Sequence, residues 1–127
     1  MDATPSPSPA ELGFVEVDAT TFDREVRDVR DALVLVYMWG PNCPNCVVFK
    51  HALPQMRAQL VGLPVRFVAV DVYTHGDVGL AHGLYGVPAF ALYRDGKKLG
   101  LMRQFHGVDY FVAVIREHLP GASAARA

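Results

Sequence analysis

The chain has 127 residues, a length that fits one compact domain with short terminal extensions and excludes two full domains. Hydrophobic residues make up 51% of it and charged residues 20%, which favours a packed core over disorder. The formal net charge of -1 leaves no excess of positive charge for a nucleic-acid backbone, so we expect no nucleic acid among its partners.

The two ends of the chain differ in composition from the region between them. Residues 1–11 are rich in proline and serine, which neither sustain a helix nor pair in a sheet, so a disordered leader is expected. Residues 121–127 are expected to form a flexible tail, which leaves 12–120 as the folded domain. The acidic start lacks the basic and apolar parts of a secretory signal, and no apolar run approaches the roughly 20 residues that span a bilayer. A cytoplasmic location without membrane attachment is therefore expected.

The first half of the chain predicts two strands and two helices. A short strand is expected at 14–17, and the Thr-x-x-Asp pattern that opens 20–30 is typical of a capped helix. The continuous apolar run 32–38 predicts a central strand covered on both faces. Beyond it, apolar residues recur every three or four positions over 49–60, which predicts one buried face of a long helix.

The second half predicts a strand, a helix, a hairpin and a final helix. The strand is expected at 65–71, and a short helix over 77–85 begins at an aspartate that could cap it. Strands at 89–93 and 99–105 flank an Asp-Gly turn and should be antiparallel neighbours. Another aspartate could cap the helix at 109–119. Strands alternating with helices predict an α/β fold with helices on both faces of a sheet.

The motif Cys43-Pro44-Asn45-Cys46 lies where the predicted central strand ends and the long helix begins. In the first helical turn, this spacing brings both sulfurs close enough for a disulfide. The helix dipole and the free N–H groups stabilise a thiolate there, so a thiol pKa can fall from about 8.5 to between roughly 3.5 and 7.5. Cys43 lies outermost and is the candidate nucleophile, and Pro44 suits the first helical position because its missing donor would be unpaired anyway.

A metal site is the alternative for the two cysteines. They could form half of a zinc site with His51 as a third ligand, although the sequence offers no evident fourth ligand. The remaining histidines share no spacing and are interpreted as surface or hydrogen-bonded side chains: His75, His82, His106 and His118.

Three segments resemble the thioredoxin family in order and spacing. They are 34–46, which ends in the Cys-x-x-Cys motif, the Gly-Val-Pro-Ala sequence at 86–89 and the Arg-Asp-Gly turn at 94–96, and the likeness extends over about 14–119. The resemblance implies the thioredoxin fold, a three-layer α/β/α arrangement around a mixed sheet of about five strands. It also implies a monomeric thiol-disulfide oxidoreductase that reduces protein disulfides, requires no cofactor and is regenerated by an electron donor such as a thioredoxin-reductase-like enzyme.

The resemblance assigns roles to individual residues. Cys43 corresponds to the attacking cysteine and Cys46 to the resolving one. Pro88 corresponds to the cis-proline that faces the disulfide, and the backbone of Val87 to the group that pairs with an extended substrate segment. Trp39 corresponds to the tryptophan that packs beneath the disulfide.

The chain departs from the family at several of these positions. Tyr37 stands where thioredoxins place a buried aspartate that assists the resolving thiol, and Ala69 where they place its lysine partner. Asn42 replaces the tryptophan before the first cysteine, at the substrate surface. Pro44-Asn45 replaces Gly-Pro, and a proline directly after the first cysteine resembles glutaredoxins and periplasmic disulfide oxidants. Tyr37 is therefore either a packing residue or a hydrogen-bond donor that modulates the pair.

Two functions remain open on sequence alone. The first is a protein-disulfide reductase that works through a Cys43 mixed disulfide resolved by Cys46. The second is a non-catalytic redox-sensing or binding module of the same fold, in which the pair reports oxidation without turnover.

Overall fold

The computed structural model describes residues 13–41, 43–84 and 86–120, so the leader and the tail expected at the two ends lie outside the described residues. Five strands form one mixed sheet in the order β1-β3-β2-β4-β5. This confirms the α/β class and the predicted mixed sheet. The strands are β1 (Val15–Glu16), β2 (Leu33–Trp39), β3 (Val65–Asp71), β4 (Ala89–Arg94) and β5 (Lys97–Met102).

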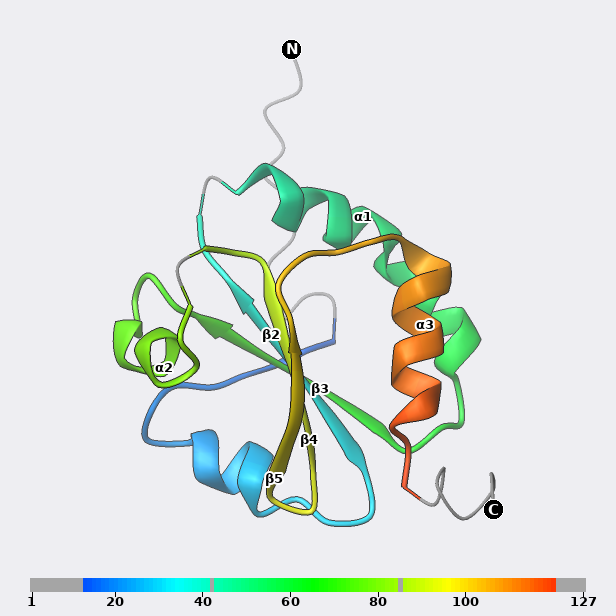
Figure 1. The fold of residues 1–127 in the computed structure, drawn as a ribbon, viewed down its shortest axis with the longest axis horizontal. Coiled ribbons are helices and arrows are strands. Elements are labelled where there is room, and N and C mark those ends of the chain that lie inside the picture. The colour runs from blue at the N-terminus through cyan, green and yellow to red at the C-terminus, as the bar shows by residue number, and fades with distance from the viewer. Residues whose placement is uncertain (1–12, 42, 85, 121–127) are drawn as a thin grey trace.

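Helices cover both faces of the sheet, which gives the three-layer arrangement (Figure 1). One face carries the long helix and the last helix, and the other carries a single π-helical turn and a short helix. Within the described residues, no helix combines the length and the hydrophobicity needed to cross a membrane. The helical elements are η1 (Asp23–Arg27), α1 (Pro44–Leu60), α2 (Gly76–Ala81) and α3 (Val108–Glu117).

Strand β2 is the centre of the sheet and leads to the cysteines. It pairs in parallel with β3 and antiparallel with β4, and every residue before Trp39 is buried. Because successive side chains of a strand point to opposite faces, its apolar run supplies both cores. Leu35 and Tyr37 join the core beneath α1 and α3, whereas Val36 and Met38 join the core beneath η1 and α2.

The β4–β5 hairpin confirms the predicted antiparallel pair, but β5 begins and ends earlier in the chain than expected. Asp95 and Gly96 adopt positive φ values of 52° and 83°, the conformation that an Asp-Gly hairpin turn requires. Strand β5 ends at Met102, so residues 103–105, predicted as strand, lie in the loop that follows.

The helix ends differ from the predicted caps. The predicted helix over 20–30 is only the turn η1. It begins later than predicted because the carboxylate of Asp18 accepts hydrogen bonds from the N–H groups of Thr20 (2.8 Å) and Thr21 (3.1 Å) and fixes a turn before it. Helices α2 and α3 begin after His75 and Gly107, neither of which caps through its side chain. The aspartates predicted as caps instead lie in the first turns of these helices, where a carboxylate still interacts favourably with the helix dipole.

A buried histidine connects α2 to the sheet on the face opposite α1. The His82 side chain is 6% exposed, and its Nδ1 lies 2.9 Å from the carbonyl of Val78, which can only accept. Nδ1 therefore donates, and Nε2 of the neutral ring accepts from the hydroxyl of Tyr93 at 2.9 Å. Burial, with further contributions from Lys98 and Arg27, lowers the pKa of His82 below its usual value of 6.5.

This histidine is expected to make folding pH-dependent. Since the pKa of His82 is lower in the folded state, the stability that the neutral ring contributes is fully present above about pH 6.5. This contribution is lost as the pH falls through the folded pKa. Denaturant titrations at a series of pH values should show this loss, and His82→Gln should remove most of the slope below about pH 6.5. The exposed His51→Gln is the control and should leave the slope unchanged. An identical slope in His82→Gln and the parent protein would contradict the expectation.

Candidate active site

The two cysteines lie at the junction of β2 and α1. Cys43 is the N-cap residue of α1, with extended backbone angles of φ -113° and ψ 101°, and Pro44 occupies the first helical turn. Cys43 and Cys46 form a disulfide with their Cα atoms 5.2 Å apart. The backbone N–H of Cys46 donates a hydrogen bond to Sγ of Cys43 at 3.2 Å. The same N–H would stabilise negative charge on Cys43 once the disulfide is reduced.

The two sulfurs differ in their access to solvent. Cys43 is 9% exposed and Cys46 only 2%. The order agrees with the expectation that Cys43 is outermost, but most of Cys43 is covered as well. A reaction partner can therefore approach the edge of Cys43, whereas Cys46 faces the core cluster of Tyr37 and Phe49.

The charged groups around the two cysteines favour a thiolate. No acidic residue occurs in the sequence between Asp31 and Asp71, a range that includes all of α1. Nζ of Lys50 lies 5.3 Å from the centre of the Trp39 ring, and burial lowers the pKa of Lys50. A helix N-terminus whose first turn holds no carboxylate is an environment that stabilises a thiolate.

A cleft of about 480 Å³ lies beside the first turn of α1. The Val87–Pro88 peptide bond is cis, as the resemblance implied, and both residues line the cleft. Asn45, between the cysteines, lines it as well. The cleft thus joins the Cys-x-x-Cys turn to the loop before β4, two segments that are far apart in the sequence. Its other described lining residues are Val48, Leu84, Gly86, Arg103, Gln104 and Phe105.

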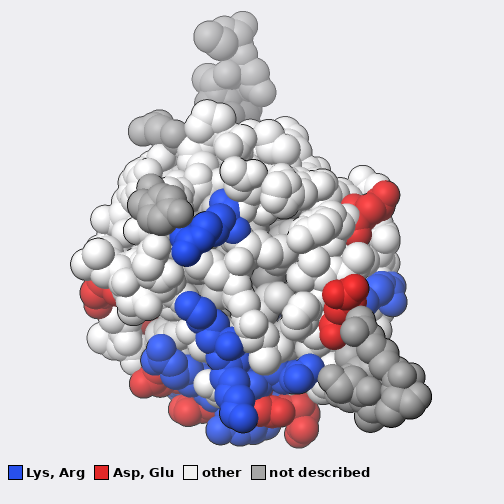
Figure 2. Space-filling model, in the orientation of Figure 1, with Lys and Arg blue, Asp and Glu red and all other residues white. Residues whose placement is uncertain are grey.

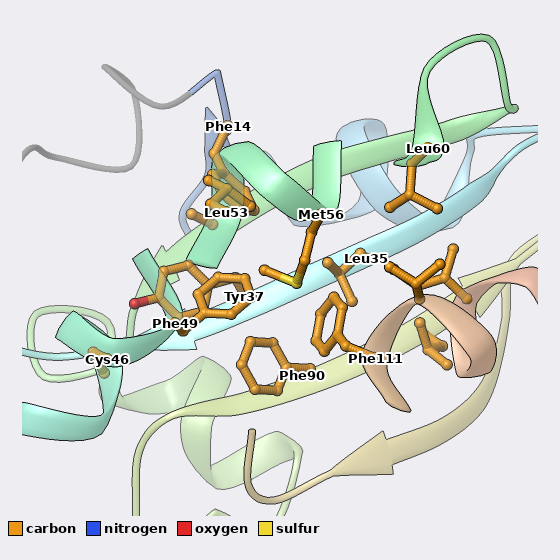
Figure 3. Packing of buried hydrophobic residues seen from close by; sticks show 14 of the residues in the cluster. Phe14, Leu35, Tyr37, Cys46, Phe49, Leu53, Met56, Leu60, Phe90 and Phe111 are labelled. Carbon is orange, nitrogen blue, oxygen red and sulfur yellow. The ribbon is translucent and has the colours of Figure 1, made fainter. Parts of the chain in front are cut away.

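Tyr37 lies inside the core cluster, on the strand that leads to the cysteines (Figure 3). Its side chain is 0% exposed, and its ring stacks on Phe90 with centroids 5.7 Å apart and contacts Phe49 at 4.7 Å. The hydroxyl has no hydrogen-bond partner among the described residues. Burial raises the pKa of Tyr37 well above its usual value, so the phenol stays neutral and cannot act as a base.

Trp39 ends β2, and its side chain packs against the cluster that contains both cysteines. Its buried Nε1 has no hydrogen-bond partner among the described residues. Next to it, Gly40 allows the ring of Tyr73 to lie against the backbone, because a Cβ on Gly40 would approach that ring to 3.0 Å. Tyr73 is 64% exposed.

The structure brings most of the predicted site residues together. The disulfide joins Cys43 and Cys46, and the cleft joins Asn45, Val87 and Pro88. Asn42 lies outside the described residues. Sequence reasoning missed the residues that follow β5, namely Arg103, Gln104 and Phe105. The predicted extension of that strand concealed them, and the change from alternating to polar residues at 103–104 was the available signal.

The zinc alternative finds no ligand set in the described part of the chain. There, no three or more side chains of His, Cys, Asp or Glu come together in a way that could hold a metal ion. His51 lies within α1 and is exposed.

The family model described as Thioredoxin matches residues 13–117. The chain is 30% identical over 84 residues to a thioredoxin of Acetoanaerobium sticklandii, covering 66% of this chain and 78% of that one. It is 26% identical over 101 residues to the thioredoxin-like protein YusE of Bacillus subtilis, covering 80% and 93%.

A solved structure supports the same grouping. The crystal structure of thioredoxin f2 from Chlamydomonas reinhardtii superimposes with a TM-score of 0.73 at 27% identity, covering 85% of this chain and 98% of that chain. The family match spans every strand and helix described above, and a Cys-x-x-Cys disulfide lies at the start of α1. The chain therefore belongs to the thioredoxin family.

Proposed function

We propose that the chain reduces disulfides in protein substrates through the Cys43–Cys46 pair. The observation that carries this proposal is the disulfide at the N-terminus of α1, whose outer sulfur belongs to the N-cap residue. Asn45, between the two cysteines, lines the cleft of the cis-proline loop. A reversible disulfide at a helix N-terminus favours the thiolate that exchange chemistry needs.

The reaction begins from the dithiol form. The Cys43 thiolate attacks one sulfur of the substrate disulfide, which forms a Cys43–substrate disulfide and releases the other substrate sulfur as a thiolate. Cys46 loses its proton and attacks Sγ of Cys43, which releases the second substrate thiolate and forms the Cys43–Cys46 disulfide. The substrate gains two electrons, the protein loses two, and solvent protons neutralise the released thiolates.

The cleft supports the binding of an extended substrate segment. In this proposal the backbone of Val87 pairs with the main chain of the substrate, and Pro88 holds the segment against the cysteines. Trp39 contributes to the surface on which the substrate rests. Main-chain pairing tolerates many sequences, so several client proteins are expected.

The proposal includes the setting in which the protein works. An electron donor such as a thioredoxin-reductase-like enzyme restores the dithiol after each cycle. We place the protein in the cytoplasm as a monomer that works without a cofactor, because a close cysteine pair in a reducing compartment is more often redox-active than structural.

Cysteine variants test the function. With dithiothreitol as reductant and a protein that carries an exposed disulfide as substrate, the parent protein should turn over, and Cys43→Ser should lose turnover because a hydroxyl is not ionised at neutral pH. Cys46→Ser should accumulate a mixed disulfide through Cys43, visible by mass spectrometry and removed by excess thiol. Cys43→Ser is the matched control and should form no such adduct.

The same variants separate the proposal from the redox-sensing alternative. A non-catalytic module would oxidise and reduce its own pair but would neither turn over the substrate nor trap it in Cys46→Ser. Adducts formed equally by both variants would contradict the assigned roles of the two cysteines.

A further inference from the structure

Lys50 is a half-buried cation on the face of α1 that carries the second cysteine. It follows Cys46 by four residues, a spacing at which two side chains of a helix are neighbours with their Cβ atoms about 5–6 Å apart. Long side chains on a helix point back towards its N-terminus, so the Lys50 side chain extends towards the turn that holds the two cysteines. The ammonium is therefore directed at the start of α1.

A contact with Trp39 fixes the direction of this side chain. Nζ of Lys50 lies 5.3 Å from the centre of the Trp39 ring, within the range of a cation–π interaction. Trp39 ends β2 and packs against the core cluster that contains Cys43 and Cys46. The ring thus lies between the ammonium and that cluster. Burial lowers the pKa of Lys50, as expected for an ammonium that has lost part of its water.

No carboxylate among the described residues forms an ion pair with Lys50. Asp71 is the register partner of Trp39 on β3, but its carboxylate accepts hydrogen bonds from the N–H groups of Tyr73 (3.0 Å) and Thr74 (3.2 Å) in its own turn. On the face shown in Figure 2, acidic side chains lie along the lower part and at the right edge, and none is seen at the upper left, where α1 begins in Figure 1.

The other titratable groups near Lys50 add little charge at neutral pH. Tyr37 stays neutral because burial raises its pKa. His51 follows Lys50 on α1 but is exposed, so solvent screens any charge on its ring. From α3, Arg116 donates to the carbonyl of Gln59 at 2.7 Å, near the opposite end of α1.

We propose that Lys50 is a positioning residue whose ammonium stabilises the thiolate of the reduced cysteine pair. This inference rests on the proposed reductase function and deepens it, because the thiolate is the species that attacks a disulfide. Cys43 and Cys46 are close enough to form a disulfide, so the first ionisation of the reduced pair belongs to both sulfurs. Lys50 acts through the local potential, since a nearby cation favours the charged form of an acid.

The pH dependence of alkylation tests this role. The reduced protein is treated with iodoacetamide at a series of pH values, and the modification of Cys43 is followed by mass spectrometry. Lys50→Met keeps an unbranched side chain but removes the charge, so the apparent pKa of the pair should rise by about 0.5 unit. The rise is modest because solvent partly screens a half-buried charge. Lys50→Gln should give the same rise.

Matched variants separate the effect of charge from that of packing. Lys50→Arg keeps the charge and the contact with an aromatic ring, so the apparent pKa of the pair should stay within about 0.2 unit of the parent value. Lys97→Met makes the same substitution at an exposed position of β5, at the opposite end of the sheet from the cysteines, and should leave the pKa unchanged.

The equilibrium of the pair with glutathione gives a second readout. A less stable thiolate favours the disulfide, so at about pH 8 Lys50→Met should shift this equilibrium about two- to threefold towards the Cys43–Cys46 disulfide. Lys50→Arg and Lys97→Met should keep the parent equilibrium. Urea denaturation of each variant checks that it is folded under the conditions of the assay.

The outcomes distinguish this inference from the proposed function. Equal apparent pKa values in Lys50→Met, Lys50→Gln and the parent protein would overturn the role of Lys50, whereas turnover of a protein disulfide by the parent would still support the reductase. A rise of the same size in Lys50→Arg would also overturn it, because lost packing would then be the cause. If the shifts occur as expected but the parent protein reduces no protein disulfide, the reductase function is wrong while Lys50 still stabilises the thiolate.

Discussion

Phe49→Ala is expected to lower the free energy of unfolding by about 3–5 kcal/mol, the range found when a buried aromatic side chain is removed from a core. Phe49 is 0% exposed and lies beside Tyr37 in the cluster between α1 and the sheet (Figure 3). The loss combines the apolar area returned to water with the cavity left among its neighbours. The ring contacts Phe14, Tyr37, Phe90, Phe105 and Phe111.

This loss is large compared with the total stability of a domain, which is about 5–15 kcal/mol. Urea denaturation of the variant and the parent protein measures it, provided that the slope of each transition is the same. Val48→Ala is the control, because Val48 is the neighbouring residue of α1 and is 56% exposed, so its truncation should change stability by less than about 0.5 kcal/mol. Equal effects of the two truncations would mean that the cluster does not hold α1 on the sheet.

The sequence predicted the central part of the fold because its signals there are strong and local. The apolar run before the cysteines became β2, and the strand predicted at 65–71 coincides with β3 (Val65–Asp71). The Asp95-Gly96 turn was predictable because few residues adopt positive φ at two successive positions. Each of these signals is contained within a few neighbouring residues.

The incorrect predictions have two causes, a competing local hydrogen bond in one case and contacts between distant segments in the other. The capping pattern that began at Thr20 was overridden by Asp18, whose carboxylate organises the preceding turn, and Phe22 and Val26 then reach the sheet from a single turn. The position of Arg103 in the cleft depends on where β5 ends and on the neighbouring cis-proline loop, which no local pattern encodes. For Tyr37 the sequence predicted the position on the strand that leads to the cysteines. It did not predict that the hydroxyl would have no hydrogen-bond partner among the described residues.

Tyr37→Asp is expected to accelerate the resolution of mixed disulfides while destabilising the fold by several kcal/mol. The phenol of the parent protein stays neutral because burial raises its pKa, so it supplies no base for Cys46. A carboxylate at this position can accept the proton of Cys46, as a general base placed beside a reacting group does. The cost in stability arises because the change leaves a cavity in the aromatic cluster and buries a carboxyl group.

Two further variants distinguish the effect of the new carboxyl group from the effect of the cavity left by the tyrosine ring. Tyr37→Asn creates a similar cavity without an ionisable group and should destabilise the fold without accelerating resolution. Tyr37→Phe removes only a hydroxyl that has no partner among the described residues, so it should leave stability within about 1 kcal/mol of the parent value. Because Tyr37 does not ionise near neutral pH, Tyr37→Phe should also leave the pH profile of resolution unchanged.

Stopped-flow measurement of resolution across about pH 6 to 8 decides the role of this position. An increase in rate that occurs in Tyr37→Asp, is absent from Tyr37→Asn and grows as the carboxyl group ionises would show that proton removal from Cys46 limits the parent protein. Equal rates in all four proteins would mean that water or the departing thiolate already removes this proton fast enough. Tyr37 would then act only through packing. The tyrosine in place of the family's aspartate would stabilise the core behind the disulfide without slowing the resolution of mixed disulfides.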